Sequence, residues 1–383
     1  MGTEIMSNSQ RPVILKQGNY TKQSLAEWKD RLKIWQEIDL YKEQLEELFE
    51  IDNPEKIHQS DIHDSVKGFV DKHASEEHGD WVYYPWSGLL IHTVTEDDYF
   101  RLRTNRNQNI ITAAEQKRLY GSTALIMGLS VGNSIATTLS SAGFAKKMLI
   151  ADFDRLSTAN LNRVKAQLTD VGKTKTQLAR EQIYGINPYA ELVCFEAGIQ
   201  MKDLESIQDK IDIIFDEVDD FAMKVQMRYY ARDKKIPLVM MTSLGDNVLV
   251  DVERYDIDDM QAPFFGTVPE DILSQIVSGE ITEEDKKRYA VQLVDAKYVP
   301  TRALQSLTEI GETLVGRPQL ANAIALDGGL ATVIMKKVIL GAEISGGRYY
   351  FDVAEMLGSL SDTTPSDERS EAFKMIMGDR DGE

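Results

Sequence analysis

From Thr123 onward, short runs of apolar residues alternate with segments of helical length. Strands separated by helices form a mostly parallel sheet with helices on both faces. The pattern therefore predicts an α/β fold with a doubly wound, Rossmann-like sheet. The predicted strands are Thr123–Met127, Met148–Ala151, Glu191–Phe195, Ile211–Phe215, Pro237–Met241 and Val248–Tyr255. The predicted helices are Ser134–Ala142, Thr174–Tyr184, Phe221–Lys234 and Leu320–Ile344.

The pattern changes on either side of this region, which predicts three parts of the chain. Residues 1–97 would form a helical and β-rich accessory module, in which Ser24–Phe49 has the apolar spacing of an amphipathic helix. A boundary near Glu96–Asp98 separates this module from a nucleotide-binding domain over 98–350. That domain contains a polar insertion over 260–300, helical in places. Residues 351–383 would form a polar tail, loose at its end.

The composition restricts the partners and the location of the protein. A formal net charge of −19 disfavours a nucleic-acid partner, because an acidic surface repels phosphate backbones. The N-terminal residues lack the features of a signal peptide and no apolar run is long enough to span a membrane. We therefore expect a cytoplasmic protein that does not contact membranes.

The metal-binding and nucleophilic residue types are sparse. The single cysteine, Cys194, lies in an apolar strand pattern that is typical of a buried hydrophobic residue and not of a nucleophile. One cysteine also excludes a multi-cysteine zinc site, so no zinc is expected. All histidines precede the predicted core, at spacings that favour scattered surface positions over a metal site. They are His58, His63, His73, His78 and His92.

A turn between the first strand and helix of the core is a candidate phosphate-binding site. It carries Gly128, Ser130 and Gly132, and free N–H groups at such a turn, with the helix dipole, favour phosphate. A strict dinucleotide turn has glycine at the position of Ser130, so an ordinary tight turn stays an alternative. Asp152 ends the next strand, where an acidic residue holds a ribose or simply caps the strand. Turn and aspartate together favour nucleotide binding.

Four ordered blocks then identify the nucleotide class. They are the acidic pair Asp152 and Asp154, the segment Asn160-Leu-Asn-Arg163, the segment Val171-Gly-Lys-Thr-Lys175, and Ile186-Asn-Pro188. In this order and near this spacing, the blocks resemble the ThiF/MoeB/HesA family, bacterial relatives of ubiquitin-activating enzymes. The resemblance covers roughly residues 101–341. It implies adenylation of a carboxylate with ATP and Mg²⁺.

The resemblance also assigns roles to individual residues. Asp152 would hold the ribose, with Asp154 completing the acidic pair. Asp219 would lie near the magnesium ion, and Arg106 would be lent across a homodimer interface. The triphosphate contacts would be Asn160, Arg163 and Lys175. These residue types suit the reaction, because attack of a carboxylate on a phosphate brings negative charges together. Taken singly, these charges are also compatible with solvated helix faces, and Asp219 with a helix N-cap.

The sequence departs from the family in lacking the cysteine that forms a thioester and the paired cysteines that bind zinc. The acyl adenylate would therefore meet a nucleophile of the substrate itself, a peptide or small protein. This is similar to the family members that tailor ribosomally made peptides, of the microcin C and pantocin A type. One alternative is activation of a ubiquitin-like sulfur-carrier C-terminus. Another is a non-catalytic nucleotide-binding scaffold.

Two further segments have two interpretations each. Thr242, Ser243 and Asp246 follow a strand that in the family flanks the substrate, and they would either lie close to the acyl adenylate or form a strand–turn–strand hairpin. The aromatic segment Trp81–Trp86 would either bind a peptide edge-on or pack the small module.

Overall fold

The computed structural model describes residues 10–207, 210–342, 344–359, 361, 363 and 365–377. Its contacts divide the chain into two compact units, Met1–Lys117 with Ile183–Ala190, and Arg118–Gln182 with Glu191–Glu383. The sequence places a boundary near Glu96–Asp98, which lies at the start of helix α4 (Glu96–Thr104); this helix packs on α2 (Tyr41–Asp52) and belongs to the first unit. As functional domains, 1–97, 98–350 and 351–383 stay a prediction.

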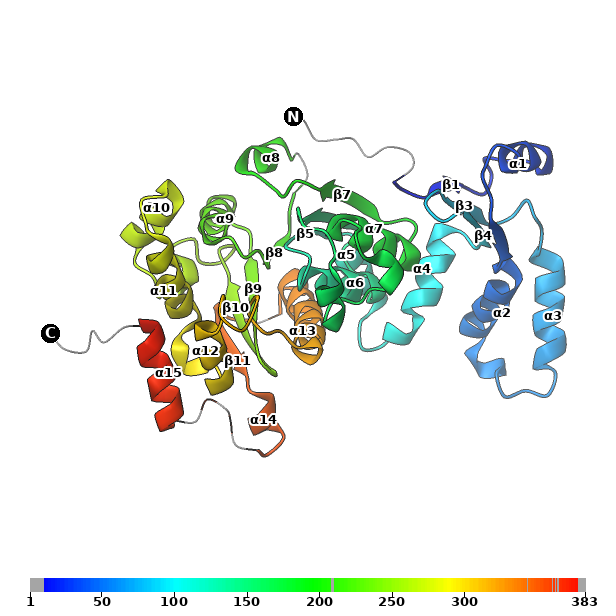
Figure 1. Ribbon diagram of the computed structural model, residues 1–383. Helices are drawn as coiled ribbons and strands as arrows, with labels where there is room; N and C mark the ends of the chain where they lie inside the picture. Colours follow the sequence, from blue (N-terminus) through cyan, green and yellow to red (C-terminus); the bar gives the residue numbers. More distant parts are fainter. Residues whose placement is uncertain are drawn as a thin grey trace. The chain divides into compact units, whose positions relative to one another are not determined.

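The first unit, within its described residues, is built on a four-stranded sheet in the order β1-β3-β4-β2 (Figure 1). Trp81, Tyr83 and Leu90 from the two central strands form its core with Tyr20 and Leu25. The strands are β1 (Val13–Leu15), β2 (Gln36–Asp39), β3 (Asp80–Tyr84) and β4 (Leu89–Thr93). The helices are α1 (Lys22–Lys29), α2, α3 (Ile62–His73), α4 and most of α5 (Ala113–Tyr120).

The single helix predicted over Ser24–Phe49 is wrong. The chain instead forms α1, then β2, then α2. Strand β2 pairs in parallel with β4, and the N–H of Trp35 donates to the carbonyl oxygen of Gly88 at 2.8 Å. These backbone bonds to a distant strand outweigh the local helical periodicity, which is a weak preference that tertiary pairing overrides.

The interpretation of all histidines as surface residues is wrong for His92. Its ring is 2% exposed and is stacked between the rings of Trp81 and Tyr41, with centroid distances of 4.2 and 4.7 Å. Its Nδ1 lies 2.9 Å from Asp39 Oδ1 and its Nε2 lies 2.7 Å from the carbonyl oxygen of His78. His92 is therefore a core residue with both ring nitrogens engaged.

The second unit contains, among its described residues, a seven-stranded sheet in the order β11-β10-β9-β8-β5-β6-β7. The strands from β9 to β7 are parallel, whereas β9, β10 and β11 are antiparallel neighbours. This sheet, with helices on both faces, confirms the predicted Rossmann-like α/β fold. Its strands are β5 (Thr123–Met127), β6 (Lys147–Ala151), β7 (Glu191–Phe195), β8 (Ile213–Asp216), β9 (Leu238–Leu244), β10 (Asn247–Glu253) and β11 (Gly347–Phe351).

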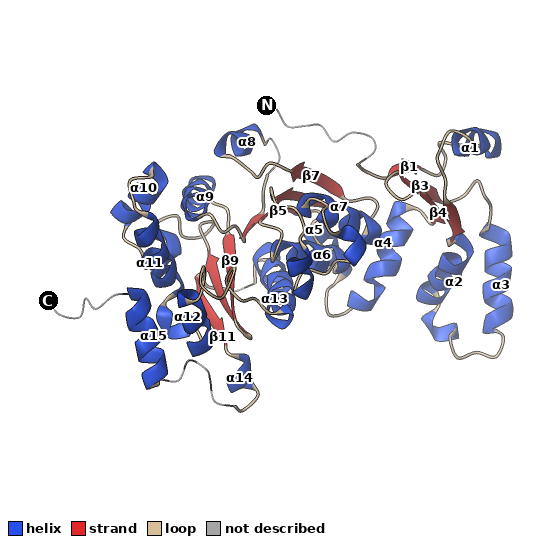
Figure 2. Ribbon diagram, in the orientation of Figure 1, coloured by secondary structure: helices blue, strands red, loops and turns tan. Residues whose placement is uncertain are grey.

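Helices cover both faces of this sheet (Figures 1 and 2). On one face lie α8 (Met201–Ser206) and α9 (Phe221–Lys234), which pack on Leu125 and Met127 of β5. On the other face lie α6 (Gly132–Ser141), the beginning of α7 (Lys175–Ile186) and α13 (Ala321–Leu340), with Gly132 against Ile126. Successive side chains of β5 thus point to opposite faces, which explains why its run of apolar residues is unbroken.

The segment after β10 is folded onto the core. It contains η5 (Pro263–Gly266), α10 (Glu270–Ser278), α11 (Glu283–Val294), η6 (Ala296–Tyr298) and α12 (Thr301–Thr308). Phe264, Leu273 and Leu293 pack against Phe221 and Val225 of α9. The predicted helical stretches within the polar insertion are thus present, and they share a hydrophobic core with α9.

The C-terminal part is more ordered than predicted. Strand β11 extends the sheet, α14 (Val353–Met356) follows it, and α15 (Asp367–Met377) packs against α12 with Ala372 buried. The loose tail is therefore wrong for 367–377, because α15 supplies an apolar contact; residues 378–383 lie outside the described part. In the residues that the structure describes, no helix has the length and apolar character to cross a bilayer.

Two adjacent glycines of α13 should respond in opposite ways to alanine. A Cβ at Gly328 would lie 2.7 Å from Ser134 Oγ and 2.9 Å from the carbonyl oxygen of Ser134 in α6, whereas a Cβ at Gly329 meets nothing within 4 Å. We expect Gly328→Ala to lower the free energy of unfolding by about 1–3 kcal/mol through overpacking. Gly329→Ala should raise it by roughly 0.5–1 kcal/mol through helix propensity. Urea unfolding followed by circular dichroism measures both, and equal effects would contradict the packing of α13 on α6.

Candidate active site

The turn after β5 is pressed against the end of β8. Gly128 has a φ of +81°, and a Cβ there would lie 2.3 Å from the carbonyl oxygen of Glu217. The N–H of Glu217 donates to the carbonyl oxygen of Met127 at 2.8 Å, and the N–H of Gly128 donates to Ala151 at the end of β6 at 2.8 Å. Only glycine fits this left-handed, crowded position. The turn therefore brings the carboxyl ends of β5, β6 and β8 together.

The predicted ribose aspartate is fixed by this turn. Asp152, 8% exposed, accepts the N–H of Leu129 at Oδ2 (2.6 Å) and the N–H of Asp154 at Oδ1 (2.7 Å). Lys175, at the start of α7, places its Nζ 2.7 Å from Asp154 Oδ2 and 3.8 Å from Asp152 Oδ2. Asp152, Asp154 and Lys175 thus form one cluster beside the turn, although two short 3₁₀ helices separate the two aspartates from Lys175 in sequence.

The Asn160 segment forms a short turn that positions Arg163. In η3 (Thr158–Asn162), Oδ1 of Asn160 accepts the N–H of Ser157 at 2.9 Å, and its carbonyl oxygen accepts the N–H of Arg163 at 3.0 Å. Nη1 of Arg163 donates to Oδ1 of Asn162 at 2.9 Å. Nδ2 of Asn162 in turn donates to the carbonyl oxygen of Gln319 at 2.9 Å, which ties η3 to the segment before α13.

A cavity of about 190 Å³ lies at the carboxyl ends of β5, β8 and β9. Its walls include Ser130 of the turn, Arg163 after η3, Asp219 after β8 and Arg317 from the segment before α13. The structure therefore brings together three of the predicted site residues, and Asp152, Asp154 and Lys175 form the neighbouring cluster. The two groups are joined by the turn, since Leu129 contacts Asp152 and the next residue, Ser130, lines the cavity.

The electrostatics of the cavity favour an anion. Burial lowers the pKa of Arg163, the Asp219 carboxylate raises it, and the charge of Arg317 lowers it further. Arg163 thus interacts with one carboxylate and with a second guanidinium group, and all three residues line the cavity. Nε of Arg163 is buried without a hydrogen-bond partner among the described residues. A buried donor of this kind is costly unless a ligand accepts from it, and guanidinium groups suit phosphate oxygens.

Residues that the sequence interpretation did not select complete the cavity. They are Glu217, Lys224 and Arg317, together with Phe221 and Leu293. Burial and the Asp327 carboxylate raise the pKa of Glu217, whose Oε1 accepts the N–H of Met241 at 2.9 Å. A motif could not reveal Arg317, because its segment reaches the cavity through the bond from Asn162 to Gln319. Glu217 and Lys224 lie within five residues of Asp219 in the sequence, and this proximity was the signal that could have identified them.

Of the two interpretations of Thr242, Ser243 and Asp246, the hairpin is observed, and closeness to an acyl adenylate stays a prediction. Thr242 and Ser243 lie on β9 and line the cavity. Strands β9 and β10 form the antiparallel hairpin, with Asn247 opposite Leu244. Asp246 lies in its turn and accepts a hydrogen bond from Nδ2 of Asn322 at 2.7 Å, and it is not among the residues lining the cavity.

The remaining predicted residues are placed as follows. Gly132 lies at the start of α6, where a Cβ would come within 2.7 Å of Ile126 Cγ2, so this glycine permits close packing of helix on strand. Arg106 lies in η2 (Asn105–Asn107) of the first unit. Its contribution across a homodimer interface stays a prediction.

Comparison with known proteins identifies the family of this chain. The model of the ThiF family matches residues 103–354, more than half of the chain. The chain belongs to the ThiF family. Its recognition from four sequence blocks is therefore confirmed, and adenylyltransferases are among its relatives.

Several relatives of this ThiF-family chain have been described. A Mycobacterium tuberculosis protein described as uncharacterised is 32% identical over 285 residues, covering 74% of this chain and 39% of that protein. Ubiquitin-like modifier-activating enzyme 5 of Caenorhabditis briggsae is 23% identical over 58% of this chain and 54% of the enzyme. The probable adenylyltransferase/sulfurtransferase MoeZ of Mycobacterium tuberculosis is 26% identical over 55% of this chain and 54% of that protein. The chain thus spans between 39% and 54% of these relatives.

Two solved structures are among the matches. The crystal structure of PaaA is 20% identical with a TM-score of 0.46, covering 66% of this chain and 76% of that one. The crystal structure of Escherichia coli MccB with ATP is 16% identical with a TM-score of 0.45, covering 65% and 67%.

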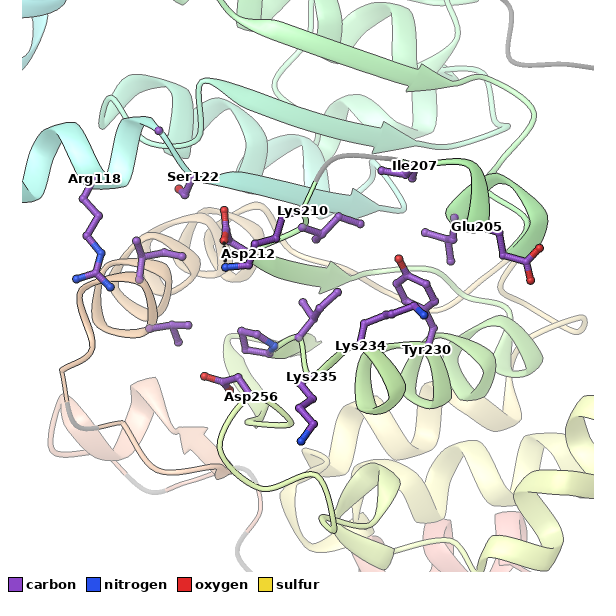
Figure 3. A pocket seen from close by; sticks show the side chains of 17 residues that line it. Arg118, Ser122, Glu205, Ile207, Lys210, Asp212, Tyr230, Lys234, Lys235 and Asp256 are labelled. Atoms are coloured by element: carbon purple, nitrogen blue, oxygen red, sulfur yellow. Dashed lines mark ion pairs between the residues drawn. The ribbon is translucent and has the colours of Figure 1, made fainter.

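A larger cavity in the same unit lies at the amino ends of the strands, opposite the candidate site (Figure 3). Its volume is about 770 Å³, and Ser122, Asp212 and Pro237 in its lining immediately precede β5, β8 and β9. None of the predicted site residues lines it. Ligands of open α/β sheets bind at the carboxyl ends of the strands, so the smaller cavity is the better candidate for the ThiF-family site.

Cys194 of this ThiF-family chain lies on β7, in register with Ile150 of β6. Burial raises the pKa of its thiol to about 11, although the nearby Arg180 opposes the rise. Cys194 is not among the residues lining the cavity. It therefore has neither the ionisation nor the position of a thioester-forming nucleophile.

The cysteine should be unreactive in the folded protein. At pH 8 a thiol of this pKa is ionised in only about one molecule in a thousand, so we expect Ellman's reagent to label native Cys194 at least about 100-fold more slowly than in guanidinium chloride. Absorbance of the released thiolate measures both rates. Rapid labelling of the native protein would show that the thiol is exposed and ionised.

Proposed function

We propose that this chain is an ATP-dependent adenylyltransferase that activates a carboxylate of a peptide or small protein. The observation that supports this most is the placement of Arg163, Arg317 and Asp219 around one cavity at the carboxyl ends of the strands. Beside it, Asp152 is fixed by the turn after β5. Two cations and a carboxylate next to a ribose-binding aspartate suit a nucleoside triphosphate with its metal ion.

ATP is a substrate of this reaction. An oxygen of the substrate carboxylate attacks the α-phosphorus, the bond from that phosphorus to the bridging oxygen breaks, and pyrophosphate leaves with the electron pair. Arg163 and Arg317 would neutralise the phosphate oxygens, which lowers the barrier because negative charges approach each other. Nε of Arg163, buried without a partner in the described structure, would then gain an acceptor.

The other predicted residues would bind the nucleotide. Both oxygens of Asp152 already accept backbone N–H groups, so they are oriented and retain lone pairs for the ribose hydroxyls. Asn160 uses Oδ1 within η3, which leaves its amide nitrogen to donate to a phosphate. Lys175 would exchange its ion pair with Asp154 for the triphosphate.

A magnesium ion fits at Asp219. No group of three metal-ligating side chains occurs within the described residues, but Mg²⁺ is commonly held by one or two carboxylates with phosphate oxygens and water. Asp219 supplies such a carboxylate at the cavity wall. When bound, the ion would supply charge neutralisation at the phosphates. Asp219 would be its protein ligand.

The acceptor in the second half-reaction would come from the substrate or a partner. Cys194 is the one cysteine of the sequence, and its raised thiol pKa and its place on β7, outside the cavity lining, do not suit a thioester relay. Direct attack by a substrate nucleophile fits a peptide-tailoring enzyme of the cytoplasm. Activation of a sulfur-carrier C-terminus is the second candidate, supported by the names of the relatives, a modifier-activating enzyme and an adenylyltransferase/sulfurtransferase.

Adenylation can be measured by exchange of labelled pyrophosphate into ATP. The probes are a panel of synthetic peptides with free carboxylates and a small protein that ends in Gly-Gly. We expect Asp219→Ala and Arg317→Ala each to reduce exchange at least about 100-fold, because each removes a charge that the transition state needs. Asp220→Ser is the matched control, since Asp220 caps α9 through the N–H of Ala222, a role that serine retains.

The outcomes separate the candidates. Exchange with a peptide supports tailoring, and exchange only with the Gly-Gly protein supports sulfur-carrier activation. ATP binding by calorimetry without exchange for any probe would contradict adenylation and favour the scaffold.

Arg106 and the homodimer are tested together. If Arg106 acts across the interface, mixing inactive Arg106→Ala with inactive Asp219→Ala under subunit exchange should restore about a quarter of wild-type exchange, because half of the dimers carry one intact site. Sedimentation velocity establishes the oligomeric state of each mixture. Activity that stays absent in mixed dimers would place Arg106 outside the partner's site.

A further inference from the structure

A buried serine–aspartate pair adjoins the candidate active site and has no task in the adenylation step. Asp327 of α13 is 0% exposed, and its Oδ2 accepts the hydroxyl of Ser243 at 2.9 Å. Ser243 lines the cavity together with Asp219 and Arg163. The hydroxyl therefore lies between a buried carboxyl group and the space where the acyl adenylate would form.

Asp327 differs from the other fully buried aspartates near it in having no cation partner among the described residues. Its Oδ1 is buried without a hydrogen bond. The titratable group facing it from the end of β8 is Glu217, another carboxyl. The α6 side chains beside the adjacent Gly328 are those of Ser134 and Thr138, which carry no charge.

A purely structural carboxyl group at this depth is expected to be paired or fully hydrogen-bonded, because burying an unsatisfied polar atom is costly. Burial raises the pKa of Asp327 to about 7, and the hydrogen bond from Ser243 opposes the rise. The group is thus able to take up and release a proton near neutral pH. Proton-transfer groups are most effective when their pKa lies near the working pH.

We propose that Ser243 and Asp327 remove the proton of the acceptor nucleophile in the second half-reaction, with Ser243 as the catalytic hydroxyl and Asp327 as the positioning residue acting through it. This inference rests on the proposed function. The acceptor nitrogen or oxygen forms a bond to the acyl carbon, the bond from that carbon to the phosphate oxygen breaks, and AMP leaves with the electron pair. The acceptor's proton passes to Oγ of Ser243 as the serine proton passes to Oδ2 of Asp327.

The pair also defines the chemical class of the acceptor. An amine, amide or hydroxyl keeps its proton at neutral pH and needs a base as it attacks. A persulfide ionises readily and needs none. Ser243 and Asp327 therefore favour an N–H or O–H nucleophile of the substrate, and they distinguish peptide tailoring from sulfur-carrier chemistry.

The test separates the two half-reactions with the peptide that supports exchange in the panel above. Wild type, Asp327→Asn, Ser243→Ala and Ser243→Thr are compared for pyrophosphate exchange and for release of AMP. The matched control is Thr332→Val on the same helix, where the hydroxyl only donates to the carbonyl oxygen of Gly328 at 2.9 Å. We expect exchange within about 3-fold of wild type in Thr332→Val. In Asp327→Asn and Ser243→Ala we expect AMP release at least about 100-fold slower, a loss that exceeds any loss of exchange by at least about 10-fold.

Further readouts exclude a structural explanation. Wild-type AMP release should rise with pH through about 7 as Asp327 loses its proton, and this limb should vanish in Asp327→Asn. Ser243→Thr keeps the hydroxyl and should retain AMP release within about 10-fold of wild type. Hydroxylamine, a nucleophile that needs little base, should restore AMP release to Asp327→Asn.

Other results overturn the inference. Equal loss of exchange and AMP release in Ser243→Ala and Asp327→Asn would mean that the pair supports the fold. Unchanged AMP release in both would mean that it has no role. If Asp327→Asn does not fold, Ser243→Ala is compared with Ser243→Thr. Equal AMP release in these two variants would overturn the role of the hydroxyl. Absence of exchange in wild type would overturn the proposed function and this inference with it. Equal loss of both activities in the variants, or unchanged AMP release, would overturn only the inference about Ser243 and Asp327 and would leave adenylation intact.

Discussion

The guanidinium of Arg228 holds the second unit together at the place where the candidate site is built. Arg228, Asp216 and Glu253 are all 0% exposed, with Nη1 2.6 Å from Asp216 Oδ2 and Nε 2.8 Å from Glu253 Oε2. The guanidinium also lies 3.7 Å from the ring centroid of Phe264. Removing one partner of such a buried group costs roughly 3–5 kcal/mol, because it leaves a charge without compensation.

This group joins four elements that are distant in sequence. Arg228 belongs to α9, Asp216 ends β8, Glu253 ends β10, and Phe264 lies in η5, where its N–H donates to Glu253 Oε1 at 2.7 Å. Glu217 directly follows Asp216 and Asp219 lies two residues further on, so fixing Asp216 also fixes the start of the loop that forms one wall of the cavity. The crowded Gly128 then holds the turn after β5, whose Ser130 lines the cavity, against Glu217. The site is thus a consequence of one ion cluster and one glycine.

The sequence predicted best those elements whose stability is decided locally. Strands β5 and β7 and helix α9 have the predicted bounds, because a short apolar run between turns, or a helix begun by an N-cap such as Asp220, needs little further information. Strand β2 could not be found in this way. Its residues are mostly exposed, and it exists because its backbone pairs with β4.

The same distinction applies to the site. Ser130, Arg163 and Asp219 were predicted because each lies in a motif tied to a strand end, and they line one cavity. Arg317 and Asp327 carry no local signal. Arg317 lines the cavity and its segment is held by the bond from Asn162 to Gln319, whereas Asp327 reaches Ser243 because α13 packs on β9 and α6. Both depend on contacts between segments that only the folded chain brings together. For the same reason, the sequence did not predict α15 or β11.

Two aspartates of this unit show how the fold assigns different tasks to the same side chain. Asp216 and Asp327 are both 0% exposed, and burial raises the pKa of each. Lys224 and Arg228 lie beside Asp216, and their charges outweigh burial, so its pKa falls below the ordinary value and it stays ionised as a scaffold anion. No such cation reaches Asp327 within the described residues, and its pKa lies at about 7. The two aspartates are equally buried and differ only in whether packing places a cation beside them. Asp216, which has such a cation, stabilises the site as an anion, and Asp327, which has none in the described part of the chain, is able to exchange protons with it.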